Sequence, residues 1–262
     1  MRIYAISDLH ADFRENRLLL ERIPAGEHRG DALIVAGDVA DSLALIGDVL
    51  GGLRQRFAEV FFVPGNHELW VRNDPRDSLE KFHAVLAACR GVGVRTAPAR
   101  VGGAWVVPLF SWYEAAFDVR GEGDHASLEA WSDRYFCRWP AGAPPVERFL
   151  EMNEPHLRDY DAPVVSFSHF VPRTELVPPA RWLRFKGLPL VAGSVAIDAQ
   201  LRRIGARVHV FGHTHIPEDR VLGGVRYVQN HMRAAGSGDG GLLKRVWSDE
   251  DASLSDAAPL FC

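Results

Sequence analysis

Short apolar runs alternate with longer amphipathic segments through most of the chain. The runs hold four to seven residues and are apolar on both faces, which predicts strands covered on both sides: Arg2–Ser7, Ala32–Ala36, Val60–Val63, Ala104–Phe110, Pro163–Ser168 and Arg207–Phe211. The segments predicted to be helical are Arg14–Ile23, Ser42–Phe57, Ser78–Arg90 and Ser194–Ile204. Asp41 and Asp77 precede two of these helices as N-cap candidates. This alternation predicts an α/β fold with helices packed on the faces of an open sheet.

Three later features complete this pattern. Gly223-Gly224 separates the apolar runs 219–222 and 225–228, which predicts a β-hairpin. The segment Trp105–Trp139 contains nine of the 26 aromatic residues, and we expect an aromatic-rich insertion at about 111–160 that packs over the sheet edge or over a site. The tail from about residue 234 is rich in Gly, Ser, Asp and Ala, so we expect it to be loose. Without a repeat or a clean linker, residues 1–262 are interpreted as one domain.

Composition excludes several classes of protein. With 47% hydrophobic residues and a net charge of −4, the chain has the balance of a globular protein and lacks the basic surplus of a nucleic-acid binder. Its three cysteines lie far apart, which argues against a disulfide framework and favours the cytoplasm. We expect no membrane segment, because no apolar run approaches the roughly 18 residues of a membrane helix. The oligomeric state is left open.

Side chains of metal-ligand type follow five of the predicted strands, at the ends where ligands bind in α/β sheets. They lie in the segments Asp8–His10, Gly37–Asp38, Gly65–Asn66, His169 and Gly212–His215. In the first and last segments the ligand-type residues are two apart, so an extended chain points them to one side. The glycines leave room for sharp turns beside the ligands. We therefore expect the five segments to converge on one site.

The candidate ligands combine oxygen and nitrogen donors, which suits Mn²⁺, Fe or Zn²⁺ better than Ca²⁺. They are Asp8, His10, Asp38, Asn66, His169, His213 and His215. The absence of thiolate argues against a structural zinc site. Seven side chains are too many for one tetrahedral ion, so they predict two divalent ions that share a carboxylate.

Five motifs resemble those of the calcineurin-like metallophosphoesterase superfamily. In order they are Asp-x-His, Gly-Asp-x-x-Asp, Gly-Asn-His-Glu, a lone His after a strand, and Gly-His-x-His, from residue 8 to residue 215. The resemblance implies a four-layer α/β/β/α sandwich of two mixed sheets, in place of the open sheet. It also implies one metal held by Asp8, His10, Asp38 and His215, and a second held by Asp38, Asn66, His169 and His213, with Asp38 bridging. His67 matches a histidine beside the leaving group, while Asp41 and Glu68 match acids that orient histidines.

Such a site predicts hydrolysis by in-line attack of a metal-bridging hydroxide on phosphorus. His67 is the expected catalytic residue, placed to assist the leaving oxygen. Two Mn²⁺ ions are expected first, with Fe, Zn, Co or Ni as alternatives. For two of these residues a simpler interpretation stays open: Asp41 as a helix cap and Glu68 as a solvated acid.

The substrate is constrained mainly by a departure from the family pattern. Protein phosphatases and diadenosine-tetraphosphate hydrolases of the superfamily carry an Arg directly after the second Asp, where this chain has Ser42. We therefore expect a phosphodiester or pyrophosphate of a small organic molecule. The alternatives are a promiscuous phosphomonoesterase and, less favoured, a nuclease, a protein phosphatase or a non-catalytic scaffold.

Substrate contacts are expected from three residues. Trp112 and Tyr113 could stack on an organic group, with core packing as the alternative. Arg173 could bind phosphate or be a solvated arginine. Among the remaining histidines, His209 is expected in the core or at a sheet edge, whereas His125 and His231 could reach the site.

Overall fold

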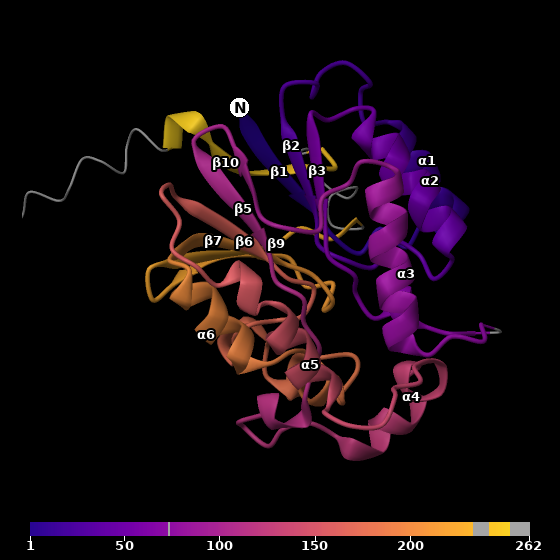
Figure 1. Ribbon diagram of the computed structural model, residues 1–262. Helices are drawn as coiled ribbons and strands as arrows, with labels where there is room; N and C mark the ends of the chain where they lie inside the picture. Colours follow the sequence, from indigo (N-terminus) through magenta and orange to yellow (C-terminus); the bar gives the residue numbers. More distant parts are fainter. Residues whose placement is uncertain (73, 233–240, 252–262) are drawn as a thin grey trace, which may run out of the picture.

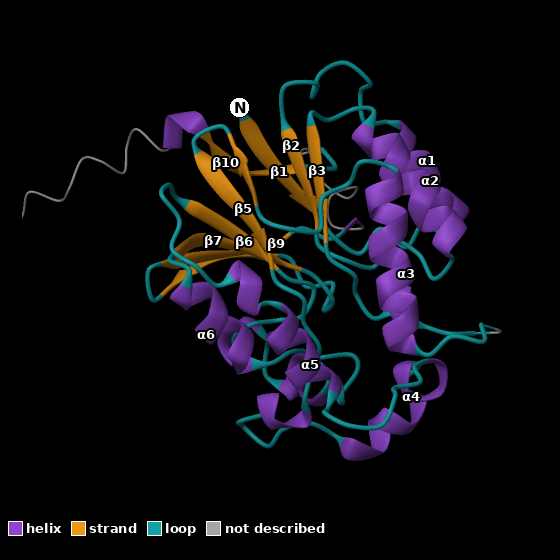
Figure 2. Ribbon diagram, in the orientation of Figure 1, coloured by secondary structure: helices purple, strands orange, loops and turns teal. Residues whose placement is uncertain are grey.

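Two mixed β-sheets lie face to face in this computed structural model, which describes residues 1–72, 74–232 and 241–251 (Figure 1, Figure 2). The first sheet has the order β10-β1-β2-β3. Its strands are β1 (Arg2–Ile6), β2 (Ala32–Val35), β3 (Glu59–Phe62) and β10 (Lys244–Ser248). β1, β2 and β3 are parallel, and β10 pairs antiparallel with β1.

The second sheet has the order β4-β5-β6-β7-β9-β8. Its strands are β4 (Ala99–Val101), β5 (Ala104–Pro108), β6 (Val164–Phe167), β7 (Ala206–Phe211), β8 (Glu218–Leu222) and β9 (Val225–Gln229). The four central strands are parallel, and β4 and β8 pair antiparallel at the edges. The predicted hairpin is confirmed as β8 and β9.

Helices cover the outer face of each sheet, so the four-layer α/β/β/α architecture is confirmed. The helices α1 (Arg14–Glu21), α2 (Leu43–Arg54) and α3 (Ser78–Gly91) pack against the first sheet through residues such as Leu20, Ile46 and Val85. On the second sheet, α6 (Val195–Arg203) contributes Leu201. Between the sheets, Ile34, Phe61 and Val208 belong to a third apolar cluster. Because both faces of each sheet are covered, central strands such as β2 and β6 are buried throughout and apolar on both faces, as their sequences indicate.

The segment 111–160 contains two helices, α4 (Asp133–Phe136) and α5 (Pro145–Met152), together with three short 3₁₀ helices (115–117, 125–130 and 154–156). Phe149 of α5 is buried in the cluster between the sheets. The segment thus forms part of the core and, through α4, reaches the candidate site.

Several expectations need correction. The supposed loose tail includes β10, which completes the first sheet; residues 233–240 and 252–262 of that tail lie outside the described residues. Ser42, not Asp41, is the N-cap residue of α2, and its side chain makes no capping hydrogen bond. Asp77 does cap α3, where it forms a capping box with Glu80. Among the described residues, no helix combines the length and apolar character that crossing a membrane requires.

Candidate metal centre

Loops that follow strands of both sheets meet at one edge of the sandwich. The N–H of Asp8, after β1, donates to the carbonyl of Gly37, after β2, at 3.0 Å. The N–H of His213, after β7, donates to the Asp8 carboxylate at 3.0 Å. Ser7 N–H donates to the carbonyl of Asn230, after β9, at 2.9 Å. The backbone itself therefore brings ligand-type residues of the two sheets together.

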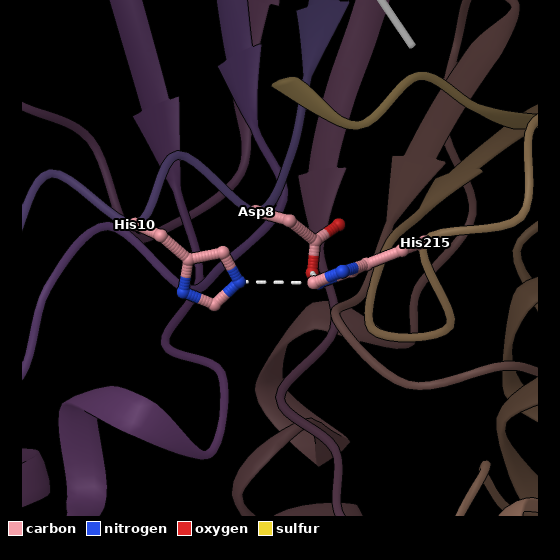
Figure 3. Close-up of side chains that lie close together, drawn as sticks. All are labelled: Asp8, His10 and His215. Carbon is pink, nitrogen blue, oxygen red and sulfur yellow. Dashed lines mark hydrogen bonds and ion pairs between the residues drawn. The ribbon is translucent and has the colours of Figure 1, made fainter. Parts of the chain in front are cut away.

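One group of candidate ligands consists of Asp8, His10 and His215, whose ligand atoms all lie within 4.8 Å of one another. The Nε2 atoms of His10 and His215 are 3.1 Å apart, and His215 Nε2 is 3.2 Å from Asp8 Oδ1 (Figure 3). Figure 3 shows the two imidazoles directed toward each other, with the carboxylate beside them. Three donor atoms from two sheets thus face a common point.

A second group consists of Asp38, His169 and His213. His169 Nε2 lies 3.2 Å from His213 Nδ1 and 3.5 Å from Asp38 Oδ2. Asn66 Oδ1 lies 3.2 Å from each of these two ring nitrogens. Two ligands about 2.1 Å from one ion are roughly 3.0–3.4 Å apart, so these spacings fit a metal site. Asp38 also groups with His10 and His67, which places its carboxylate between the two sets.

Hydrogen bonds outside the cluster fix the direction of its buried imidazoles. Nδ1 of His169 lies 2.9 Å from the carbonyl oxygen of Ala36, and Nε2 of His213 lies 3.0 Å from that of Val191. A carbonyl can only accept, so each of these ring nitrogens carries the proton. The other nitrogen of each ring is left with a lone pair directed at the cluster, which is the form that binds a metal.

The backbone is strained at the same positions. Five non-glycine residues of the described chain have positive φ, between 42° and 74°: Asp8, His10, Asp38, His213 and His215. Such conformations cost about 1–3 kcal/mol each and persist where the surrounding structure requires them. All five are candidate ligands, which ties the strain to this site.

Two glycines provide the space that the cluster needs. A Cβ atom at Gly65 would overlap Asp38 Oδ1 and lie 2.8 Å from carbons of the His169 ring. A Cβ atom at Gly37, where φ is +84°, would overlap the same ring. A side chain at Gly65 would therefore displace Asp38 and His169, and one at Gly37 would displace His169.

Burial shifts the protonation of the cluster. Desolvation, together with the neighbouring Glu68 and Asp8 carboxylates, raises the pKa of Asp38 well above its usual value. Burial also disfavours the charge of Asp8, but the nearby histidines His215, His169 and His10 together lower the pKa of Asp8. Burial and the neighbouring His169 lower the pKa of His213, so its ring is neutral. Burial lowers the pKa of both His169 and His213, so their rings offer neutral nitrogen donors beside the carboxylates, and the residues fit a metal pair.

Glu68 is fully buried and acts on the backbone. Its carboxylate accepts N–H groups from Gly65 at 2.7 Å, Asp38 at 2.9 Å, Val39 at 2.6 Å and Ala40 at 3.1 Å. It is therefore neither a solvated acid nor, in these contacts, an orienting partner of a histidine. It joins the loop that carries Asp38 to the loop that carries Asn66.

Asp41 also differs from expectation. Burial, followed by the negative charge of the nearby Asp41, raises the pKa of Asp12. Arg72 Nε lies 4.0 Å from Asp41 Oδ2, and Lys81 donates to the Asp41 carbonyl at 2.6 Å. These contacts place Asp41 beside the loop of His10, where it interacts with another acid and with cations.

His67 lies at the edge of the cluster. Its Nε2 is 3.9 Å from Asp38 Oδ2, and its ring packs against Trp70 at a tilt of 34°, with 3.7 Å between centroids. Burial, followed by the nearby histidines His10 and His169, lowers the pKa of His67 to about 2. The ring is therefore neutral at physiological pH and would assist a leaving group by donating a hydrogen bond rather than as an imidazolium.

The three expected substrate residues lie in different environments. Trp112 is buried against Trp139, Phe149 and Phe170, which agrees with the core-packing alternative. The ring of Tyr113 lies nearly parallel to that of His213, at 6.4 Å. Arg173 forms ion pairs with Glu175 and Asp198 on the outer side of the second sheet, so its charge is already compensated.

Two further residues contribute to the site: Asp133, which sequence reasoning missed, and His231, which was named as a histidine that could reach it. Asp133 of α4 is buried and accepts a hydrogen bond from Asn66. His231 follows β9 and stacks on His215 with ring centroids 5.4 Å apart. The position of His231 after a predicted strand was a usable signal. Asp133 gave none, because it lies in an irregular aromatic segment.

A cavity of about 240 Å³ opens beside the first group of ligands. Asp8, His10, His67, His215 and His231 line it together with Phe13 and Asn16 from the start of α1. The phenyl ring of Phe13 is largely exposed at this position, which offers an apolar surface next to the candidate metal site.

Comparison with known proteins agrees with this geometry. The sequence profile of the calcineurin-like phosphoesterase family matches residues 1–217. The chain belongs to the calcineurin-like phosphoesterase family. A curated relative, the acyl-carrier-protein phosphodiesterase PptH of Mycobacterium tuberculosis (strain ATCC 25618 / H37Rv), is 31% identical over 251 residues, which cover 86% of this chain and 75% of that protein. The crystal structure of phosphopantetheinyl hydrolase (PptH) from Mycobacterium tuberculosis matches with a TM-score of 0.79 and 28% identity, covering 95% of this chain and 96% of that one.

Membership in the phosphoesterase family confirms the resemblance on which the function was predicted. The protein is a hydrolase of phosphoester bonds, and the expected metal-dependent phosphodiesterase agrees with the name of the curated relative. Members of this family use divalent metals, and the His/Asp groups of this chain provide side chains that could hold such ions.

Proposed function

We propose that this phosphoesterase hydrolyses the phosphodiester that joins a phosphopantetheine group to an acyl-carrier protein. The relative named for that substrate shares 31% of its residues over most of both chains. The donor geometry of the metal centre, with its strained backbone and glycine-lined space, supports a phosphodiesterase mechanism in this chain as well.

The residues would hold two metal ions in two overlapping sets. The first consists of Asp8, His10, Asp38 and His215, and the second of Asp38, Asn66, His169 and His213. The mixed oxygen and nitrogen donors favour Mn²⁺, followed by Fe, Zn, Co and Ni. When bound, such a pair supplies an activated water and neutralises charge on the phosphate oxygens.

The remaining chemistry falls to the side chains around the cavity. His67 is neutral and lies beside Asp38, so its N–H group would donate a hydrogen bond to the oxygen that leaves phosphorus. Phe13 and Asn16 would contact the organic part of the substrate, because they line the same cavity. Glu68 holds the loop of Asp38 and the loop of Asn66 together by accepting hydrogen bonds from both.

Incubation with a phosphopantetheine-bearing carrier protein and Mn²⁺ tests this proposal. Mass spectrometry should show loss of the phosphopantetheine mass from the carrier protein and release of free phosphopantetheine. The Asp38→Asn variant serves as the control for contaminating hydrolase. Hydrolysis of bis(p-nitrophenyl) phosphate without attack on the carrier protein would contradict the substrate and retain the diesterase. A preference for p-nitrophenyl phosphate over both diesters would favour the phosphomonoesterase alternative.

A further inference from the structure

Asp133 connects the aromatic-rich segment to the second group of candidate ligands. It lies at the start of α4 and its residue is 3% exposed. Its Oδ1 atom accepts two hydrogen bonds, from Asn66 Nδ2 at 3.0 Å and from Trp70 Nε1 at 2.6 Å. A single carboxylate oxygen therefore contacts one candidate ligand and the indole ring against which His67 packs.

The first contact decides which atom Asn66 presents to the centre. An amide side chain carries an oxygen acceptor and a nitrogen donor on the same carbon, and only the oxygen can bind a cation. Because Asp133 can only accept in this contact, it holds the nitrogen of Asn66 on its own side. The oxygen of Asn66 then points the other way, 3.2 Å from both His169 Nε2 and His213 Nδ1.

The second contact acts on His67 through Trp70. The indole N–H donates to Asp133, and the indole ring packs against the His67 imidazole at 3.7 Å between centroids. Rotation of Trp70 would break this hydrogen bond and remove the surface on which His67 rests. Asp133 thus restrains a candidate ligand and the candidate catalytic ring together.

Burying the Asp133 carboxylate costs free energy of desolvation. Its Oδ2 atom is buried and accepts no hydrogen bond from the described residues. An apolar residue of similar size would avoid that desolvation penalty, which is about 1–3 kcal/mol. The carboxylate is therefore difficult to explain by packing alone.

We propose that Asp133 is a positioning residue of the metal centre: it orients Asn66 as an oxygen ligand and holds Trp70 behind His67. This inference rests on the metal-binding part of the proposed function and not on the identity of the substrate. It makes α4 of the aromatic-rich segment a structural requirement for the second metal site.

Metal binding separates this inference from the proposed substrate. Chelator-treated protein is titrated with Mn²⁺ by equilibrium dialysis, and spin coupling between two Mn²⁺ ions is followed by electron paramagnetic resonance. The wild type should bind two equivalents. Asp133→Ala, or Asp133→Leu where alanine impairs folding, should weaken the second equivalent by about 10- to 100-fold and abolish the coupling.

Matched variants distinguish positioning from general damage. Asp133→Asn retains the accepting oxygen and should bind the second Mn²⁺ more tightly than Asp133→Ala. Asp31→Ala removes another buried carboxylate that is not part of the metal centre and that accepts a hydrogen bond from Arg2 at 2.6 Å. This variant should still bind both equivalents of Mn²⁺. In an Asn66→Ala background, Asp133→Ala should have no further effect on the second equivalent.

Two results would overturn the inference: two coupled Mn²⁺ ions with wild-type affinity in Asp133→Ala or Asp133→Leu, or a wild type that binds fewer than two equivalents. Failure to hydrolyse the carrier-protein diester, with two ions bound in the wild type, would instead overturn the proposed substrate. The comparison between the Asp133 variants and the wild type would still decide the role of Asp133.

Discussion

The carboxylate of Glu68 accepts the backbone N–H of Asp38 at 2.9 Å, although the two residues are 30 positions apart. The same carboxylate accepts N–H groups from Val39, Ala40 and Gly65. One buried side chain therefore links the loop after β2 to the loop after β3 through their backbone N–H groups. The loops after β2 and β3 then carry Asp38 and Asn66 to the same place.

Replacing Glu68 by alanine should destabilise the protein by on the order of 3 kcal/mol, because four buried N–H groups lose their acceptor. Glu68→Gln should be milder but still destabilising, since its amide nitrogen cannot accept. Urea unfolding of metal-free protein measures both effects. A free energy of unfolding within 1 kcal/mol of wild type for Glu68→Ala would show that water or another group satisfies these donors.

Gly65→Ala should yield a folded protein with impaired metal binding. The added methyl group would overlap Asp38 Oδ1 and crowd the His169 ring, so these two candidate ligands must move apart. Gly47→Ala is the matched control, because it lies within α2 with no atom within 4 Å of the added carbon. This control should be neutral or slightly stabilising, since alanine favours helices over glycine. Equal Mn²⁺ content in both variants would refute the steric argument.

Asp38→Asn should reduce bound metal and activity together. Asparagine preserves the shape of the side chain but removes the negative charge that two cations would share. Elemental analysis of reconstituted protein, alongside hydrolysis of bis(p-nitrophenyl) phosphate, measures both quantities. Asp161→Asn, at an exposed carboxylate that contacts Trp105, is the control. Full metal content in Asp38→Asn would exclude a bridging role for this carboxylate.

The sequence predicted the parts of this fold that depend on local pattern. Apolar runs covered on both sides gave β1, β2, β3, β5, β6 and β7 within about two residues of their observed bounds. Ligand-type residues directly after these strands predicted the convergence at one sheet edge, because parallel strands end together there. The division into two sheets came from the family resemblance, since local periodicity does not encode which strands pair.

Contacts between distant segments could not be predicted in the same way. β10 has the sequence Lys-Arg-Val-Trp-Ser and forms a strand because the edge of β1 is available for pairing. Asp133 lies 67 residues from Asn66 in a segment without regular periodicity, so its partner becomes visible only in three dimensions. Glu68 was identified as a site residue by its motif, but its contact with four backbone groups required the structure.

His67→Ala should retain two metal ions while slowing hydrolysis by roughly 10²–10⁴-fold for poor leaving groups. His67 lies close to His10 and Asp38, with Nε2 3.9 Å from Asp38 Oδ2, but it belongs to neither of the two proposed four-residue ligand sets. Its proposed task is to hydrogen-bond the leaving oxygen. Aryl phosphodiesters with phenols of increasing pKa provide the measurement. The ratio of wild-type to variant rates should rise with the pKa of the phenol. A constant ratio across the series would remove His67 from the departure of the leaving group.

Because of His209, the free energy of unfolding should decrease at acidic pH. His209 is fully buried in β7, where its two ring nitrogens lie 2.8 Å from Ser166 Oγ and 3.0 Å from Ser168 Oγ. Burial lowers the pKa of His209 to about 3. The unfolded chain takes up a proton near pH 6.5 while the folded protein does not, so stability is highest above that pH and falls as pH decreases toward 3.

At pH 5 the expected loss from His209 is about 2 kcal/mol relative to neutral pH. Other buried histidines add to acid sensitivity, so the informative quantity is the difference between wild type and His209→Gln in metal-free protein. Urea unfolding at pH 7.5 and at pH 5 should show a smaller pH-dependent decrease for the variant, by about that amount. His209→Leu, which also cannot titrate, should show the same reduced decrease even though its stability at neutral pH differs. If both variants lost as much stability between pH 7.5 and pH 5 as the wild type does, His209 would have the same pKa in the folded and unfolded states. That result would contradict the pKa lowering expected for a buried imidazole.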